Sequence, residues 1–409
     1  MRVALVLLLA ACTPAQKTHD VRIVLKHQPL FGDPAPFRAL LDSFRRDNPG
    51  VALEEEALPG GSDLAHQFFL TALDAGADDF DVLAIDVVWV PEFARAGFLA
   101  DLSASFPPET LRKEYLPATA ASVLLDGKAW AVPWYLDVGI LYYRTDLVPR
   151  APRTYDELRA FAEAARQKDP SLAGYLWQGR QYEGLSCNFF EAAWGHGAAQ
   201  DPRGAASLQV DTPAGRAGLE WLRSTLVSGL SPPQVAAATE EETRRVFQDG
   251  RAVFLRSWPY VWAEVQRSPL RGRVGWTTLP TLDGTPGAGA LGGWELALNA
   301  HARPERRAAA LQLIAHLTSE KAAVELALAY SRNPARRAAY DDARLRQGAP
   351  FIASLLPAAL AARPRPVSPY YDLAADTLQG ELSAAIVGLR SPATALSRAQ
   401  ALMTHLEEQ

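Results

Sequence analysis

The stretch WQGRQYEGLSCNFF, residues 177 to 190, gathers aromatic rings, glutamines, an arginine, a glutamate and a cysteine. It could form a nucleophilic thiol, a metal site or the wall of a polar pocket. A catalytic thiol needs a partner histidine, and the nearest, His196, lies nine residues beyond Cys187 between two glycines. The seven histidines form no pair at helical ligand spacing, so no zinc site is predicted. We therefore expect Cys187 to be a small buried apolar residue.

Further polar and aromatic residues follow the ends of predicted strands, where open α/β sheets bind their ligands. These groups are Asp86 with Trp89, Trp134 with Tyr135 and Asp137, Trp258 with Tyr260 and Trp262, Gly292-Gly293-Trp294-Glu295, and Arg363 with Arg365. Each group also has a purely structural interpretation. An aspartate suits a helix N-cap, aromatic groups suit core packing, a glycine pair suits a strand bulge, and arginines in a proline-rich segment suit a rigid surface connection.

Together these groups favour a sugar as the ligand. The C–H faces of a sugar ring suit indole and phenol rings, and its hydroxyls suit planar carboxylate, amide and guanidinium groups. The chain has ten tryptophans, which fits that demand. It has no phosphate-binding Gly-Lys-Ser/Thr loop, no Gly-x-Ser-x-Gly elbow and no dinucleotide fingerprint. We therefore expect a binding protein and not an enzyme, without a cofactor or a metal.

The elements that position these residues alternate between strand and helix. The apolar pattern predicts strands at 21–27 and 80–85 and helices at 35–50 and 62–76, the second with Ser62 as N-cap. This order implies a largely parallel sheet. The long apolar stretch 129–147 breaks at Pro133 and suits a crossover between two lobes.

A second mixed region begins at a capping box from Thr154 to Glu157. Its predicted helices lie at 154–167, around 189–196, 213–227 and 240–249, its strands at 251–257, 273–280 and 289–300, and the last helices between 304 and 406. A chain of 409 residues is too long for one simple core, so two lobes are expected.

Charge and the N-terminus indicate where the protein works. The net charge is −5, and no run of Lys and Arg is longer than a pair, so nucleic-acid binding is not expected. An apolar run from Val3 to Ala11 is too short to span a bilayer but suits a secretory signal. It ends in Leu-Ala-Ala-Cys, which resembles a bacterial lipobox with Cys12 as the lipidated residue. The alternative is a misplaced start before an ordinary strand.

The chain resembles a family 1 extracellular solute-binding protein of an ABC sugar importer, in the branch of maltose and trehalose/maltose receptors. The matching segments are FDVLAIDVVWVPEFARAGFLADL, AWAVPWYLDVGILYYRTDL, WQGRQYEGL, RSWPYVWAEV, LGGWELALN and the segment from RPRPVSPYY to ALSRAQ. They cover nearly the whole mature chain in the family's order.

The resemblance implies an α/β fold of periplasmic-binding-protein type II, with two lobes, each a mixed sheet flanked by helices, and several hinge crossings. The expected division is 1–20 as signal peptide and tether, 21–136 plus 290–316 as lobe 1, and 137–289 plus 317–409 as lobe 2. The implied sugar contacts are Asp86 from the first lobe, Tyr135 and Asp137 at the hinge, Trp258 and Tyr260 as stacking walls, then Gly293, Trp294 and Arg365. Trp177, Gln178 and Glu183 match a motif that helps to shape the cleft and are further candidates for sugar binding, either by contact with the sugar or by holding the residues that contact it.

The sequence departs from the family pattern in the early loop HQPLFGDPAP and at residues 65–68, which lack the charged residues expected there. His66 or Asp33 is the candidate to replace them, and the identity of the sugar is left open. The function expected is a monomeric lipoprotein that captures a disaccharide such as trehalose or maltose and delivers it to membrane permease subunits. It would work outside the cytoplasmic membrane, held by its lipid anchor. A lipid-anchored glycosidase and a sugar-sensing receptor are the alternatives.

Overall fold

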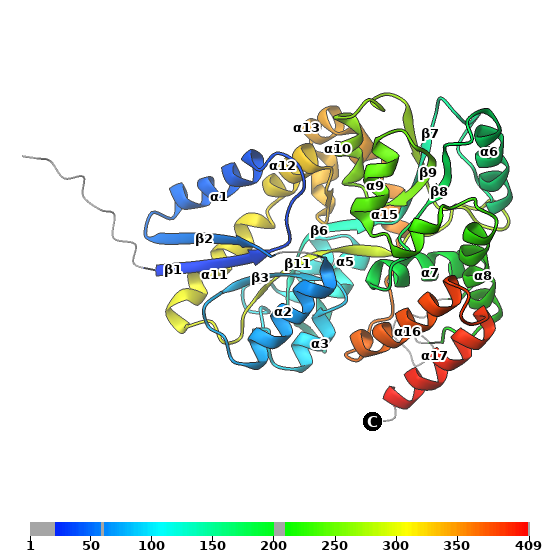
Figure 1. Cartoon of the computed structure of the whole chain (residues 1–409). Helices are drawn as coiled ribbons and strands as arrows, with labels where there is room; N and C mark the ends of the chain where they lie inside the picture. The colour runs from blue at the N-terminus through cyan, green and yellow to red at the C-terminus, as the bar shows by residue number, and fades with distance from the viewer. Residues whose placement is uncertain (1–20, 59–60, 200–208, 408–409) are drawn as a thin grey trace, which may run out of the picture.

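Two β-sheets, each covered by helices, form two lobes that lie side by side (Figure 1). The computed structural model describes residues 21–58, 61–199 and 209–407. Cys12 and the predicted signal peptide, 1–20, lie outside the described residues. Within the described part of the chain, no helix has both the length and the apolar character needed to cross a bilayer.

The first lobe is built on a six-stranded sheet with the order β12-β6-β11-β3-β1-β2. Its strands are β1 (Val21–His27), β2 (Val51–Ala57), β3 (Val82–Asp86), β6 (Val132–Val138), β11 (Leu291–Leu298) and β12 (Asn333–Pro334). The first three pair in parallel, and β11 runs antiparallel to both β3 and β6. Every residue of β3 is buried, as expected for a central strand covered by helices on both faces.

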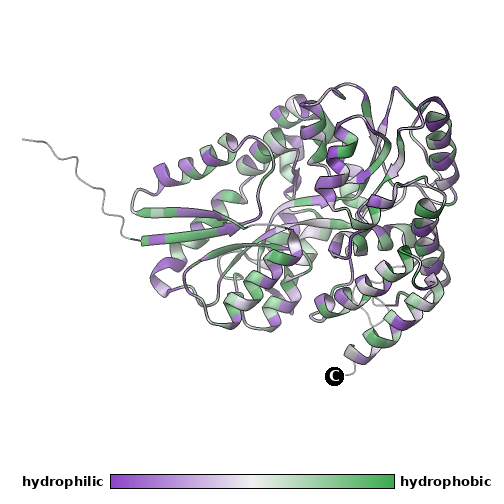
Figure 2. Cartoon of the chain, viewed as in Figure 1, coloured by the Kyte–Doolittle hydropathy of each residue, from purple (hydrophilic) through white to green (hydrophobic). Residues whose placement is uncertain are grey.

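Helices cover the sheet of this lobe, and the longer ones bury a mainly apolar face. The lobe contains α1 (Ala35–Asp47), α2 (Ser62–Asp74), α3 (Val90–Arg95), α4 (Pro108–Glu114), α5 (Pro117–Ser122), α11 (Pro304–Leu317) and α12 (Glu320–Tyr330), with the hairpin β4 (Leu124–Leu125) and β5 (Lys128–Ala129). In α1 the buried residues Phe37, Leu40, Leu41 and Phe44 recur at helical spacing. Figure 2 shows the matching hydrophilic residues on the outer side of α1.

The second lobe is built on a four-stranded sheet with the order β10-β7-β9-β8. Its strands are β7 (Ile140–Arg144), β8 (Ala173–Leu176), β9 (Ala252–Ser257) and β10 (Val274–Thr277). Its helices are α6 (Tyr155–Lys168), α7 (Glu183–Gly195), α8 (Pro213–Val227), α9 (Glu240–Gln248), α10 (Val261–Gln266), α13 (Ala343–Gly348), α14 (Pro350–Ser354), α15 (Leu356–Ala361), α16 (Tyr371–Ile386) and α17 (Pro392–Glu407), and its 3₁₀ turns are η2 (Pro233–Ala237) and η3 (Arg337–Asp341). Helix α7 is buried from residue 184 to 195, so it is the central helix of this lobe.

The chain crosses between the sheets at glycines and at β12. The predicted break at Pro133 is wrong, because Pro133 lies inside β6 and the strand ends beyond it. The change of sheet comes at Gly139, where a Cβ would collide with the Glu191 carboxylate. The predicted end of lobe 1 at residue 316 is also wrong. Strand β12 still pairs with β6, so the chain stays in the first sheet through Pro334.

Two helix starts differ from the sequence prediction. Helix α7 begins at Glu183 and not near 189, so its first turn belongs to the polar stretch that precedes it. The N-cap of α2 is Gly61, and the Ser62 hydroxyl bonds to the Asp63 carboxylate instead of capping the helix. The cap at Thr154 is confirmed, since its hydroxyl accepts a hydrogen bond from the backbone N–H of Glu157.

A candidate ligand cleft between the lobes

A cavity of about 570 Å³ lies between the two lobes, a size typical of small-molecule sites. Nine of the predicted site residues line it: Asp86, Tyr135, Asp137, Glu183, Trp258, Tyr260, Gly293, Trp294 and Arg365. They come from the ends of β3, β6 and β9, the start of α7 and β11, and the segment before α16. The structure therefore brings together residues that are up to 279 positions apart in the sequence.

Asp86 stands at the end of β3 and accepts two hydrogen bonds. One of its carboxylate oxygens accepts the backbone N–H of Val88 at 3.2 Å and the Arg365 guanidinium at 2.9 Å. The local turn and the ion pair therefore share that oxygen. Trp294 is directly opposite Asp86 in the β3–β11 pairing, and its ring meets Trp89 edge to face at 5.5 Å. The helix N-cap expected as the alternative for Asp86 is wrong, because α3 begins at Val90 with Trp89 as its N-cap, and Asp86 instead closes the turn that follows β3.

Arg365 connects the two lobes across the cavity. Besides Asp86 of the first lobe, it donates to Glu183 of the second lobe at 2.7 Å. Glu183 also accepts hydrogen bonds from the Tyr371 hydroxyl at 2.6 Å and from the Gln379 amide at 3.1 Å. Burial raises the pKa of Glu183 to about 7, against the opposing effect of Arg365. Arg365 is 2% exposed, and its Nε has no hydrogen-bond partner among the described residues.

A second ion pair lies at the hinge. Arg332 donates to the Asp137 carboxylate at 3.2 Å, and its guanidinium lies over the rings of Tyr135 and Tyr260 at 4.8 and 5.0 Å. Burial raises the pKa of Asp137, while Arg332 counteracts that effect. The second carboxylate oxygen of Asp137 has no partner within the described part of the chain. It is available as an acceptor for a ligand hydroxyl.

Trp258 forms a wall of the cavity, and its partners fix its orientation. The indole N–H donates to Glu240 at 3.1 Å, and the Arg256 guanidinium lies over the ring at 4.1 Å. Glu240 also accepts the Tyr182 hydroxyl at 2.7 Å, while Glu241 accepts the Tyr260 hydroxyl at 3.0 Å. These glutamates open α9. Their side chains therefore hold the tryptophan and the tyrosine in place from the second lobe.

Gly292 and Gly293 let the backbone of β11 pass close to the cavity. Gly293 has a φ of +128°, and a Cβ there would collide with the Tyr135 carbonyl oxygen. A Cβ on Gly292 would lie 3.3 Å from the Trp258 ring. The register of β11 shifts between Trp294 and Glu295. The strand bulge expected as an alternative is therefore present next to the glycine pair, and the same residues also line the cavity.

Trp177 and Gln178 lie behind the cavity and do not line it. Trp177 is fully buried, and its indole N–H donates to the hydroxyls of Thr225 and Ser231 at 3.1 Å. Gln178 accepts from the Arg256 guanidinium at 3.2 Å and donates to the Arg256 carbonyl at 3.0 Å. Arg256 in turn packs on the Trp258 ring, so Gln178 helps to hold Trp258 in the cavity wall through Arg256. A contact of either residue with the ligand is not consistent with this placement.

His66 is also outside the cavity, and so is Asp33. The His66 ring is buried at the seam of the two lobes and bonds to Glu92 at 2.7 Å. The Asp33 carboxylate accepts the backbone N–H of Ala35 at the start of α1. The cavity does contain Cys187, whose side chain is buried as predicted, and burial raises the pKa of its thiol.

Sequence reasoning missed several residues that line the cavity. These are Gln28, Phe31, Asp63, Tyr182, Glu240, Glu241 and Arg332. The run Thr239 to Glu242 carries a capping-box pattern, which fixes a helix start and could have directed attention to Glu240. Arg332 gave no such signal, because it follows α12 in a short connection, after a residue with left-handed backbone, Ser331.

Known proteins are similar to this chain in sequence and in fold. The sequence profile of the family described as bacterial extracellular solute-binding protein matches residues 28–324. A "Probable ABC transporter-binding protein" of Deinococcus radiodurans is 35% identical over 311 residues, covering 73% of this chain and 72% of the relative. The solved structure of maltose-bound MalE3 of T. maritima is 34% identical, with a TM-score of 0.87 and coverage of 94% of this chain and 100% of that one.

A more distant structure shares the fold alone. The GacH receptor of Streptomyces glaucescens is 20% identical, with a TM-score of 0.82, and the match covers 95% of this chain and 98% of that one. These likenesses confirm the predicted two-lobe α/β fold. The profile match and the Deinococcus relative each cover more than two thirds of the chain, and on that ground the protein belongs to the bacterial extracellular solute-binding protein family.

Proposed function

We propose that this protein captures a sugar, of the size of a disaccharide such as maltose or trehalose, between its lobes. The observation that carries the proposal is the composition of the cavity, in which aromatic rings alternate with carboxylates and guanidinium groups from both lobes. Trp258, Tyr260 and Trp294 offer flat apolar faces, and Asp86, Asp137 and Arg365 offer hydroxyl partners. Maltose-bound MalE3, at 34% identity, supports this class of ligand.

Binding would act through closure of the lobes. A ligand that contacts both lobes favours the closed form by the difference in its affinity for the two forms. Arg365 already joins Asp86 and Glu183 across the cleft, so groups from both lobes meet at one point. The closed form would then be recognised by the permease subunits of an ABC importer, as the name of the Deinococcus relative supports.

The protein would be exported and held at the cell envelope through a lipid on Cys12. The support is the sequence Leu-Ala-Ala-Cys after an apolar run and the polar residues that follow. No step in this function breaks a covalent bond, so no catalytic residue is assigned. Mass spectrometry of the protein purified from membranes would show the added acyl mass on an N-terminal peptide that begins at Cys12. An unmodified peptide beginning at Met1 would contradict the anchor.

Calorimetric titration with maltose, trehalose and sucrose tests the ligand class. A sugar present at a hundredfold excess over its dissociation constant should raise the free energy of unfolding by about 2.7 kcal/mol. Hydrolysis of each sugar is followed in the same samples by chromatography. A product peak would favour a glycosidase and contradict transport without chemistry. Absence of heat and of stabilisation with all three sugars would refute the proposed ligand class.

A further inference from the structure

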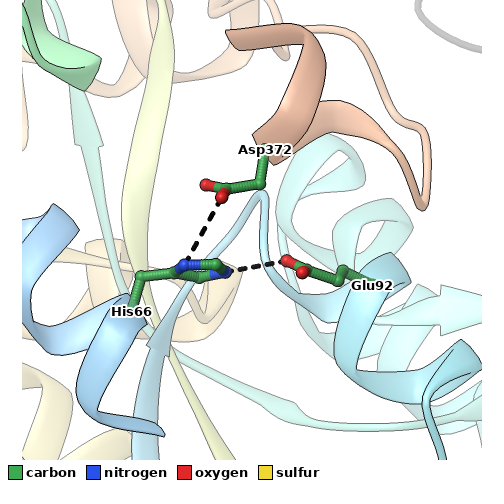
Figure 3. Close-up of side chains that lie close together, drawn as sticks. All are labelled: His66, Glu92 and Asp372. Carbon is green, nitrogen blue, oxygen red and sulfur yellow. Dashed lines mark hydrogen bonds and ion pairs between the residues drawn. The ribbon is translucent and has the colours of Figure 1, made fainter. Parts of the chain in front are cut away.

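Three side chains outside the cavity join the two lobes at their seam. His66 belongs to α2 and Glu92 to α3 of the first lobe, whereas Asp372 belongs to α16 of the second lobe (Figure 3). The imidazole Nε2 is 2.7 Å from a Glu92 carboxylate oxygen, and Nδ1 is 3.5 Å from a carboxylate oxygen of Asp372. The ring is therefore held between two acids, one from each lobe.

The surroundings of His66 fix its position. The ring is 4% exposed and packs against Trp89 at 5.2 Å and Phe93 at 5.4 Å. A second contact involves α3. The Arg95 guanidinium lies 4.8 Å from the ring centre of Tyr370, the residue directly before α16. Two contacts thus join α2 and α3 to the start of α16. Both must break when the lobes separate.

The two nitrogens of an imidazole point away from each other. Both can donate a hydrogen bond only in the charged, doubly protonated ring, because the neutral ring has one N–H. An acid on each side therefore favours imidazolium. A metal ion shared by all three residues would need one nitrogen facing both carboxylates, whereas here Glu92 and Asp372 face different nitrogens. The arrangement suits a proton better than a metal.

We propose that His66 is a protonation-dependent latch that holds the two lobes closed through Asp372. It rests on the proposed function only in that lobe closure is coupled to capture of a sugar. Asp63 of α2, Glu92 of α3 and Asp372 of α16 are the acidic groups around the ring. Each is negative when ionised and so favours the charged ring, whereas Asp376, one turn further along α16, acts on Asp372 and not on the ring.

The direction of the pH effect follows from which partner is lost on opening. Burial favours the neutral ring, but Glu92 and Asp372 together raise the pKa of His66 above its usual value. Opening removes Asp372 but leaves Glu92 and the packing of the ring on Trp89 and Phe93 of its own lobe, so the ring stays largely buried and the pKa of His66 is lower in the open form. The latch is complete below the open-form pKa and is lost as the pH rises through the closed-form pKa. Burial also raises the pKa of Asp372, so strong acid weakens the latch again.

The test starts with the ligand-free protein. The pKa of His66 is measured by NMR titration of the ring protons, assigned with His66→Gln, in the wild type, in Asp372→Asn and in Asp376→Asn. X-ray scattering of the same proteins at about pH 5.5 and about pH 8.5 reports lobe opening. We expect Asp372→Asn to lower the pKa of His66 and to have the same large radius of gyration at both pH values, whereas the wild type has a smaller radius at the lower pH. Asp376→Asn is the matched control and should retain the pH-dependent opening.

Maltose titration then tests the coupling to binding. Wild-type affinity should be about fivefold higher at the lower pH, the size expected of one ion pair at a partly exposed seam, and equal at both pH values in Asp372→Asn. An unchanged pKa of His66 in Asp372→Asn, or a wild-type radius independent of pH, overturns the latch. Failure of maltose to bind at either pH counts against the sugar proposal alone, because scattering and NMR still decide the latch.

Discussion

Replacing Trp258 by alanine is the sharpest test of where the ligand lies. Trp258 lines the cavity and is held by Glu240 and Arg256 behind it. An indole buries about 150–250 Å² when fully covered, and a ligand stacked on one face covers about a third of it. At about 25 cal/mol per Å², this contact contributes about 1.3–2.1 kcal/mol, or about 8–35-fold in the dissociation constant. Trp258→Ala should therefore weaken maltose binding by about that factor.

Trp177 provides the matched control from the same lobe. It is fully buried, hydrogen-bonded to Thr225 and Ser231, and absent from the cavity wall. Trp177→Ala should cost about 3–5 kcal/mol of folding stability, because it leaves a cavity in a packed core. Trp177→Phe keeps most of the volume and should lose about 1 kcal/mol through the missing N–H. Neither variant should change the affinity of the folded protein for maltose.

Two measurements on each variant separate these effects. Urea unfolding gives the stability, and calorimetric titration at a temperature where every variant is folded gives the affinity. The reasoning holds if folded Trp258→Ala loses affinity, whatever its loss of stability, and Trp177→Phe loses stability at no cost in affinity. Equal loss of affinity in the two variants, or an unchanged dissociation constant in Trp258→Ala, would show that the ligand does not stack on this ring.

Three further substitutions test the electrostatics and backbone of the cleft. Arg365→Met leaves the carboxylates of Asp86 and Glu183 buried without a cation, so urea unfolding should show a loss of about 3–5 kcal/mol, and adding Glu183→Gln should recover part of it. Burial raises the pKa of Glu295 to about 8, whereas the unfolded chain releases this proton near pH 4.5. The free energy of unfolding of the wild type should therefore decrease as the pH rises from about 4.5 to about 8. Glu295→Gln removes that loss. In urea unfolding, the variant should be about 3–5 kcal/mol more stable than the wild type at about pH 9, and the two proteins should be nearly equal in stability at about pH 4. A stability difference that does not depend on pH would contradict a protonated Glu295. Gly293→Ala forces a side chain into a left-handed backbone against β6 and should lower the free energy of unfolding by about 2 kcal/mol or more. Unchanged stability in urea unfolding would contradict the φ of +128°.

Local sequence patterns were sufficient for most elements and for much of the cavity wall. Period-two and helical apolar spacing located β1, α1, α8 and α11 closely, since each buries one face against its own lobe. Strand ends with a carboxylate beside aromatic residues indicated Asp86, Asp137 and Trp258, which do line the cavity. Their contact with a ligand is still a prediction.

Only the tertiary structure decided which polar residues face the cleft and which support it. Trp177 and Glu183 lie six positions apart in one motif, yet the first is in the core of the second lobe and the second lines the cavity, because the chain turns after β8 and α7 begins at Glu183. Arg332 reaches the cavity from a short connection that has no recognisable pattern. The position of a residue in the sequence does not show which residues of the other lobe it will contact.

The sequence by itself determined the family pattern, the two-lobe α/β class and the chemistry that the cleft offers, because these depend on residue types and local periodicity. The structure decided the ion pairs of Arg365 with Asp86 and Glu183, and the place of His66 between α3 and α16. Each of these contacts joins segments that meet only when the two sheets pack together. Such pairings depend on the packing of whole lobes, and no local pattern records them.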